Sequence, residues 1–175
     1  LFCMILSTML MACTETLENI PSGCEDVNGF NVTWRSNVTD KQREAIRTIL
    51  NDLQLVEGGT FLMGATQEQT PYARENEKPA HYVQLSNFYI GKHEISIQQL
   101  EVLLYKEFSA YERSHGAPQY TWTDWKMVID LIYEYSGIEL DFPTEAQWEY
   151  AARGGNKGNG CIYSGGNSIS TIENS

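Results

Sequence analysis

Apolar residues recur at helical spacing in four segments of the chain, and each segment follows a polar residue that suits a helix start. The first segment covers residues 39–54. Thr39 and Gln42 form a T-x-x-Q capping box, in which the two side chains satisfy free backbone N–H groups of the first turn. The expected buried face of this leading helix consists of Ala45, Ile46, Ile49, Leu50 and Leu53.

Two further helices are predicted in the middle of the chain. Ser96 and Gln99 make another capping box, and Thr123 is expected to cap the next helix, which Gly137 would end. The second helix buries Ile97, Leu100, Leu103, Leu104 and Phe108, and the third buries Trp125, Val128, Leu131, Ile132 and Tyr135.

The fourth helix lies in the sequence PTEAQWEYAARGG, residues 143–155, which we call the signature segment. Thr144, after Pro143, is paired with Gln147 in a capping box. Glu145 places negative charge in the first turn, where the helix dipole favours it. Gly154 is expected to end the helix in the left-handed conformation.

The side chains of the signature segment predict a structural helix. Glu149 and Arg153 are four residues apart, in the order that favours an ion pair. Trp148, Ala151 and Ala152 share one face, which we expect to pack closely against a sheet or another helix.

Strands are predicted between these helices. A short strand is expected at residues 30–34. Two apolar runs flank Glu57-Gly58-Gly59 within residues 55–64, which favours a hairpin with a glycine turn. Residues 81–96 have strand composition, whereas residues 65–80, 109–122 and 154–168 are expected to be loops.

Composition narrows the class of protein. The 175 residues suit one domain of ordinary size, and ten Tyr, four Trp and frequent Gly suit a loop-rich mixed fold. The net charge of -11 argues against binding of nucleic acid or anionic lipid through a basic surface.

The N-terminus has the character of a targeting segment. Residues 1–12 are uncharged and apolar but too short to span a bilayer, which is typical of a signal peptide. Leu10-Met11-Ala12-Cys13 resembles the lipobox of bacterial lipoproteins, so Cys13 is the expected lipidation site and residues 13–38 the expected tether. The alternative is a plain secretory signal with a chance Cys. The remaining cysteines, Cys24 and Cys161, could form one disulfide in an oxidising compartment, but the sequence does not decide whether they pair.

The residues offer no candidate catalytic centre. His81, His93 and His115 form no metal-binding spacing, and His93-Glu94, expected in a strand, would point to opposite faces. Cys161 stands in a glycine-rich loop without an activating neighbour. The acidic run 68–77 lacks the alternation of a calcium loop. We therefore assign no residue of this sequence a catalytic or metal-binding role.

Four stretches in fixed order resemble one family: VEGGTFLMGA, EKPAHYVQLSNFYIGKHEIS, YTWTDWKMVIDLI and FPTEAQWEYAARGG. Together they look like the sulfatase-modifying factor domain of formylglycine-generating enzymes, from about Leu55 to about Gly166. The resemblance implies an α+β, loop-rich fold related to C-type lectins. It also implies that residues 55–175 hold an incomplete, C-terminally truncated domain.

The resemblance leaves the function open among three classes. Family enzymes carry calcium ligands and a copper-binding cysteine pair in a C-terminal half, so this chain is expected to hold no cofactor itself. Asp141, Phe142 and the EIS of residues 94–96 depart from the family pattern. These departures favour a non-catalytic binding or structural lipoprotein over the N-terminal part of a formylglycine-generating oxidase. A lectin-like surface receptor is the third class.

The expected location and partners follow from the two resemblances. The lipobox implies the cell envelope, and Thr14 favours the outer membrane of a Gram-negative bacterium. The expected partners are the membrane, through the lipid, and a protein or glycan ligand, with no nucleic acid.

Overall fold

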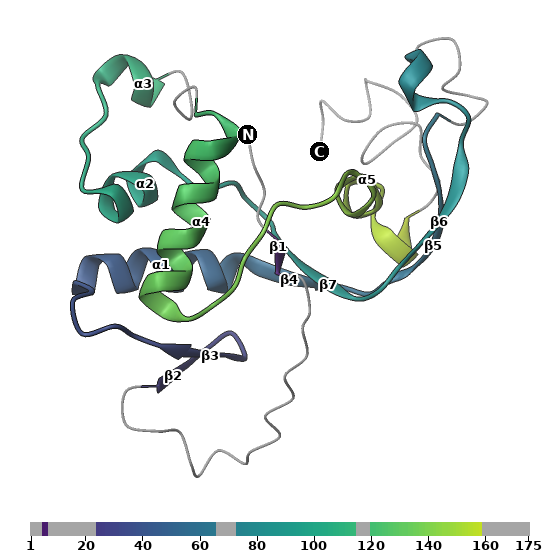
Figure 1. Ribbon diagram of the computed structural model, residues 1–175. Coiled ribbons are helices and arrows are strands. Elements are labelled where there is room, and N and C mark those ends of the chain that lie inside the picture. The colour runs from purple at the N-terminus through teal and green to yellow at the C-terminus, as the bar shows by residue number, and fades with distance from the viewer. Residues whose placement is uncertain (1–4, 7–23, 66–72, 115–119, 159–175) are drawn as a thin grey trace. The chain divides into compact units, whose positions relative to one another are not determined.

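The computed structural model describes residues 5–6, 24–65, 73–114 and 120–158 (Figure 1). The chain forms two compact units: the first contains residues 1–54 and 89–142, and the second contains residues 55–88 and 143–175. Helices and small sheets are mixed irregularly along the chain, which confirms the predicted α+β class.

Three helices and a hairpin build the first unit. The helices α1 (Asp40–Asp52), α2 (Ile97–Leu104) and α4 (Trp122–Ser136) pack on one another. The strands β2 (Cys24–Val27) and β3 (Phe30–Thr33) form an antiparallel hairpin against α1 and α4. The fully enclosed side chains of this core include Val32, Ile46, Leu50, Leu100, Val128 and Ile132.

Capping boxes set the helix starts in the first unit. The boxes of Thr39 with Gln42 and of Ser96 with Gln99 are confirmed. The prediction for Thr123 is wrong by two residues: Thr121 caps α4, because its hydroxyl accepts from the Asp124 N–H while the Asp124 carboxylate accepts from the Thr121 N–H. Gly137 ends α4 with φ of 72°, as predicted.

The segment expected as a loop over residues 109–122 contains a short helix, α3 (Ala110–Ser114). Its start is set by Ser109, whose hydroxyl accepts from the Glu112 N–H at 3.2 Å, while the Glu112 carboxylate accepts from the Ser109 N–H at 2.8 Å. This Ser-x-x-Glu pattern is a capping box that the sequence interpretation overlooked.

Gln42 has a second role beyond capping. Its side chain is 1 % exposed, and its Oε1 accepts from the Thr39 N–H at 3.0 Å and from the Tyr105 hydroxyl at 3.2 Å. Its Nε2 donates to the Tyr135 hydroxyl at 3.3 Å. A single amide therefore connects the start of α1 with the end of α2 and with α4.

The described part of the predicted tether, residues 24–38, is folded. Val27 and Val32 of the hairpin are buried in the core of the first unit, so this part of residues 13–38 does not act as a tether. Arg47 fixes the hairpin to α1 by donating through Nε and an NH2 nitrogen to the Glu25 carboxylate at 2.7 and 2.8 Å. These hydrogen bonds from Arg47 lower the pKa of Glu25.

A three-stranded sheet contains the segments in which the chain passes from one unit to the other. Strands β1 (Ile5–Leu6), β7 (Phe88–Gly91) and β4 (Leu53–Val56) form a three-stranded sheet in that order. Strands β4 and β7 each carry the chain from one unit to the other. No helix among the described residues is long and apolar enough to cross a membrane.

The second unit is small. Strands β5 (Gly59–Met63) and β6 (His81–Leu85) pair antiparallel, and α5 (Glu145–Ala152) packs against both. Two 3-10 turns, η1 (Glu75–Glu77) and η2 (Gly155–Lys157), complete its described part.

The hairpin predicted around Glu57-Gly58-Gly59 is wrong. Strand β5 pairs with β6, whereas β4 belongs to the sheet with β7. The Gly58 N–H donates to Asn87 Oδ1 at 2.9 Å, and a Cβ on Gly58 would lie 2.8 Å from the backbone nitrogen of Asn87. Gly58 therefore serves close approach between distant segments, and it does not form a turn.

Candidate functional site

The signature segment folds as predicted at both ends. The Thr144 hydroxyl accepts from the Gln147 N–H at 3.2 Å, and Gln147 Oε1 accepts from the Thr144 N–H at 2.9 Å. Glu145 lies in the first turn of α5, and Gly154 follows the helix with φ of 86°. The local signals thus define the limits of α5.

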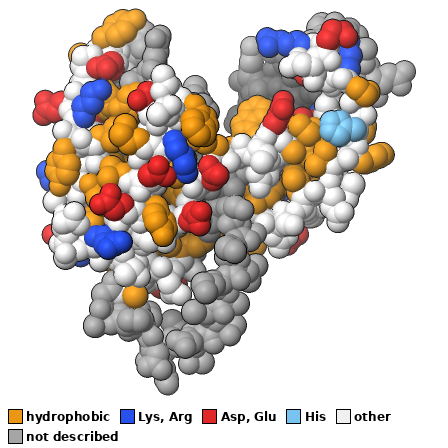
Figure 2. Space-filling model, in the orientation of Figure 1, with side chains coloured by type: hydrophobic (Ala, Val, Ile, Leu, Met, Phe, Trp, Pro, Cys, Tyr) orange, Lys and Arg blue, Asp and Glu red, His pale blue; other side chains and the backbone are white. Residues whose placement is uncertain are grey.

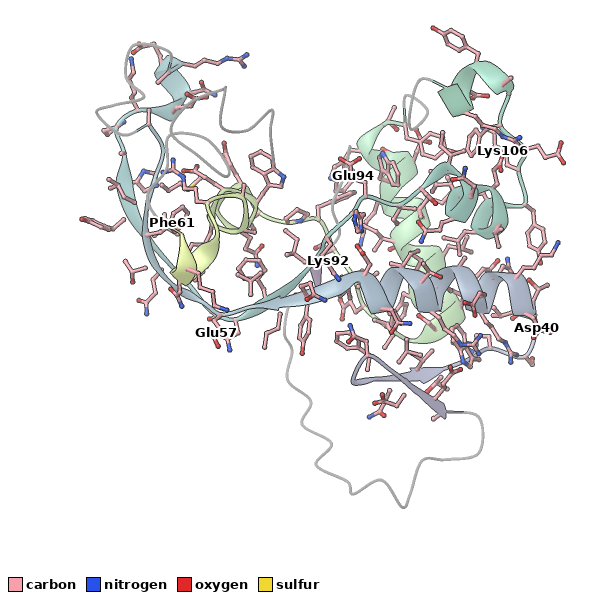
Figure 3. All side chains as sticks on the ribbon, turned by 180° about the vertical axis from the view of Figure 1, so that it is seen from behind. Asp40, Glu57, Phe61, Lys92, Glu94 and Lys106 are labelled. Atoms are coloured by element: carbon pink, nitrogen blue, oxygen red, sulfur yellow. The ribbon has the colours of Figure 1, made fainter. Side chains whose placement is uncertain are left out.

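The orientation of α5 differs from the prediction. Tyr150 is the buried ring at 2 % exposure, and Trp148 is 58 % exposed, so the expected burial of Trp148 is wrong. The Tyr150 ring centroid lies 5.1 Å from that of Phe61 on β5 and 6.4 Å from that of Phe88. Figure 3 labels Phe61 on β5. Two residues of helix correspond to about 200° of rotation, so a buried Tyr150 turns Trp148 away from the sheet.

A polar network explains why Tyr150 takes the inward position. Its hydroxyl lies 3.1 Å from the Glu57 carbonyl oxygen and 2.6 Å from Asn156 Oδ1, and Asn156 Nδ2 donates to the Gly58 carbonyl at 2.9 Å. Burial raises the pKa of Tyr150, and the negative charge of Glu57 adds to this effect. A neutral tyrosine hydroxyl therefore ties α5 and η2 to the start of β5.

Gly59 makes room for this network. A Cβ on Gly59 would contact Asn156 Oδ1 and would lie 2.7 Å from the Tyr150 hydroxyl oxygen. The Glu57-Gly58-Gly59 sequence is thus required for two close approaches, one to the backbone of residues 85–87 and one to α5.

Glu149 and Arg153 fix the other end of β5. The predicted ion pair is confirmed at 2.6 Å, and both side chains also bind the backbone of Gly64. Glu149 Oε1 accepts from the Gly64 N–H at 2.9 Å, and Arg153 donates to the Gly64 carbonyl at 2.8 Å. Gly64 has φ of 97°, and a Cβ there would lie 2.7 Å from the Glu77 carbonyl oxygen.

The outer face of α5 is the feature with potential for binding. Trp148 and Glu145 are exposed, and Ala151 and Ala152 are half-buried. Because Tyr150, Glu149 and Arg153 hold the inner face, the helix presents these four residues, which we call the Trp148 face, from a fixed position. Other large apolar side chains are exposed on the first unit, including Trp122 at 62 %. Figure 2 shows hydrophobic side chains among charged ones on the face that it displays.

His93 has a defined partner in the first unit. It lies after the end of β7, so its expected place in a strand is wrong. The His93 N–H donates to Asp52 Oδ2 at 2.7 Å, and its Nδ1 lies 2.7 Å from Asp52 Oδ1.

A small pocket lies beside this pair, lined by Ile49, Asp52, Leu53, Gly91, His93, Glu94, Ile95 and Gln99. This lining offers no Ser, Thr, Cys or Lys that a His–Asp pair would activate as a nucleophile. The pair therefore joins the last residue of α1 to the segment that follows β7.

The other candidate residues form no centre within the described parts of the chain. Cys24 is a free thiol whose Sγ lies 3.3 Å from Thr33 Oγ1. His81 Nδ1 lies 3.2 Å from the Pro79 carbonyl oxygen. Cys13, His115 and Cys161 lie outside the described residues, as does the first half of the acidic run 68–77. Within the described parts of the chain, no group of three or more His, Cys, Asp or Glu is placed to hold a metal ion.

Sequence reasoning missed Tyr150, Asn156 and Gly64. The apolar residues of α5 are distributed on all sides of the helix, so periodicity does not select a buried face. They are Ala146, Trp148, Tyr150, Ala151 and Ala152. No sequence signal selected the Tyr150 side: the Glu149–Arg153 pair lies on that side, but its binding to the Gly64 backbone is seen only in the folded chain.

Residues 38–174 match the family model of the sulfatase-modifying factor enzyme 1-like domain, and the chain belongs to that family. The matched region begins before α1, so the leading helix lies within it. The chain is also similar to the Chaperone protein LppX of Paenibacillus barcinonensis, with 27% identity over 154 residues that cover 69% of this chain and 51% of the relative. The chain thus spans about half the length of this curated relative. No solved structure matches this chain.

The described residues include one free thiol, Cys24, and no group of three or more His, Cys, Asp or Glu that would hold the copper or calcium of formylglycine-generating enzymes.

Proposed function

We propose that this protein is a binding module of the cell envelope, which uses the Trp148 face to hold apolar segments of other polypeptides. The observation that carries the proposal is the exposure of Trp148, 58 %, on a helix whose opposite face is fully engaged. An exposed large aromatic ring on a rigid support is typical of recognition surfaces.

The anchoring of α5 supports a binding role for the Trp148 face. The ring need not be displaced from a core to meet a partner, because Tyr150 and the contacts to Gly64 hold the helix independently. Burial of an indole ring contributes about 2–3 kcal/mol at about 25 cal/mol per Å2 of apolar surface. A few such contacts give a weak and reversible complex, which suits transient binding of a polypeptide.

The name of the relative from Paenibacillus barcinonensis supports a polypeptide as the ligand. That protein is called a chaperone. Chaperones as a class bind unfolded chains, which expose apolar segments. Because the match covers about half of that relative, the role is proposed for the Trp148 face alone. A glycan is the alternative ligand, since sugar rings also stack on exposed indoles.

The envelope location rests on the N-terminal sequence. We propose that the mature chain begins at Cys13 and carries a lipid there, which attaches the module to the outer membrane. Mass spectrometry of the mature N-terminus is expected to find a lipid-modified Cys13. An unmodified Cys13, or cleavage at another residue, would contradict the anchor.

Fluorescence anisotropy of a dye-labelled, uncharged peptide of leucine and serine tests the binding role. The full chain is expected to bind this peptide, and Trp148→Ala is expected to weaken binding about tenfold or more, as for a central aromatic contact. Trp122→Ala is the matched control, because Trp122, on the first unit, is exposed to a similar extent. Equal loss in both variants, or no loss with Trp148→Ala, would contradict the proposal.

The family match supports one other function, namely that the chain forms part of a formylglycine-generating oxidase. Incubation of the full chain with a sulfatase-type cysteine peptide, copper and oxygen tests this alternative. We expect no aldehyde above background, because the described residues offer no pair of thiols. Aldehyde formation would establish the enzyme and refute a purely binding role.

A further inference from the structure

The Trp148 face carries a negative charge beside its aromatic ring. Glu145 lies three residues before Trp148, so the two side chains are neighbours on the surface of α5. Both are exposed. Among the described residues the Glu145 carboxylate takes part in no hydrogen bond or ion pair, whereas the other carboxylate of the helix, Glu149, is engaged by Arg153 and Gly64.

No cation of α5 balances this charge. The only basic residue at the end of the helix, Arg153, is turned to the Gly64 carbonyl and to Glu149, with its side chain 25% exposed. Lys157 lies beyond the helix in η2. The chain as a whole has a net charge of -11, which attracts cationic partners and repels anionic ones before contact.

We propose that the polypeptide segments held by the Trp148 face are both apolar and positively charged, with an arginine or lysine next to the apolar side chain. This inference rests on the proposed binding role. The Trp148 ring receives the cation on its face or the aliphatic stem along its edge, and the Glu145 carboxylate pairs with the charged head. Ala151 and Ala152 have short side chains, so a partner backbone can approach the helix beside the ring.

Three labelled peptides of equal length and apolar content test the proposal: one with arginine, one with glutamate and one with glutamine at the same positions. The arginine peptide is expected to bind the full chain about fivefold more tightly than the glutamine peptide, which is the size of one exposed cation–π contact or ion pair. The glutamate peptide is expected to bind most weakly, and added salt should reduce the differences.

Two variants distinguish the Trp148 face from the overall charge. Glu145→Gln is expected to remove most of the preference for arginine over glutamine. The matched control Glu134→Gln removes an exposed carboxylate from α4 and is expected to leave the preference unchanged. Equal effects of the two variants would overturn the inference and assign the preference to net charge.

The outcomes for this inference and for the binding role are separate. If Trp148→Ala weakens all three peptides and their affinities are equal in the unmodified chain, the binding role stands and the charge preference is wrong. If Trp148→Ala leaves all three affinities unchanged, the binding role itself is wrong. Circular dichroism of each variant establishes that a loss does not come from unfolding.

Discussion

Alanine substitutions of Tyr150 and Trp148 are expected to have very different effects on the stability of the second unit. Tyr150→Ala removes a ring that is 2 % exposed and that contacts Phe61 and Phe88. Loss of a buried aromatic ring destabilises a fold by about 3–5 kcal/mol. Trp148→Ala removes a larger ring that is 58 % exposed, and surface changes of this kind stay within about 0.5 kcal/mol.

Tyr150→Phe divides the effect of Tyr150 into two parts. The ring contacts remain, but the hydroxyl no longer donates to the Glu57 carbonyl or to Asn156 Oδ1. Leaving such acceptors without a donor destabilises by about 1–3 kcal/mol. We therefore expect the order of destabilisation to be Tyr150→Ala, then Tyr150→Phe, then Trp148→Ala.

Hydrogen exchange is the appropriate assay, because a chain with two units need not unfold in one step. The backbone N–H groups of β5 and β6 report on the second unit, and those of α1 and α4 serve as an internal control in the first. Faster exchange confined to β5 and β6 is expected for Tyr150→Ala. The reasoning is refuted if Trp148→Ala accelerates exchange there as much as Tyr150→Ala does.

The other predictions concern three single contacts. Gln42→Ala should destabilise the first unit by about 2 kcal/mol in urea denaturation, because its buried hydrogen bonds are lost. Gln42→Glu should also destabilise it, because a carboxylate would be buried where the amide now donates to the Tyr135 hydroxyl. Glu25→Gln should lower stability at neutral pH. Because Arg47 lowers the pKa of Glu25 in the fold, this stabilisation is complete above the ordinary pKa of a carboxyl group and disappears as pH falls through the lowered value. A pH-independent difference would contradict that assignment. Gly59→Ala should destabilise by about 1–3 kcal/mol, since its methyl group would displace the hydroxyl of Tyr150; an unchanged melting curve would contradict the close approach.

Helix limits were predictable because they depend on residues three or four apart. Thr39 with Gln42, Ser96 with Gln99 and Thr144 with Gln147 all form the expected boxes. The error at Thr123 has the same basis. Thr121 lies two residues before Thr123, and Asp124 forms a capping box with Thr121 in the place where glutamate or glutamine is usual.

Strand pairing and the direction of α5 were not predictable from local pattern. Strand β5 ends at Met63 and pairs with β6, which begins at His81, and no short-range signal distinguishes this partner from β4. The choice of Tyr150 over Trp148 depends on acceptors at Glu57 and Asn156, which only the folded chain brings together. The hairpin of residues 24–33 was assigned to a tether because its buried residues, such as Val27 and Val32, are few and separated by polar positions.

Fluorine NMR of the full chain with fluorotryptophan at its four tryptophan positions tests the central claim, that Trp148 is an exposed binding residue on an anchored helix. The Trp148 resonance is identified by its absence in Trp148→Phe. In the free protein this resonance is expected to show the large solvent isotope shift of an exposed ring, and addition of the arginine peptide is expected to move it while the Trp125 resonance stays in place. A Trp148 resonance without an isotope shift, or one that the peptide does not move, would contradict the account.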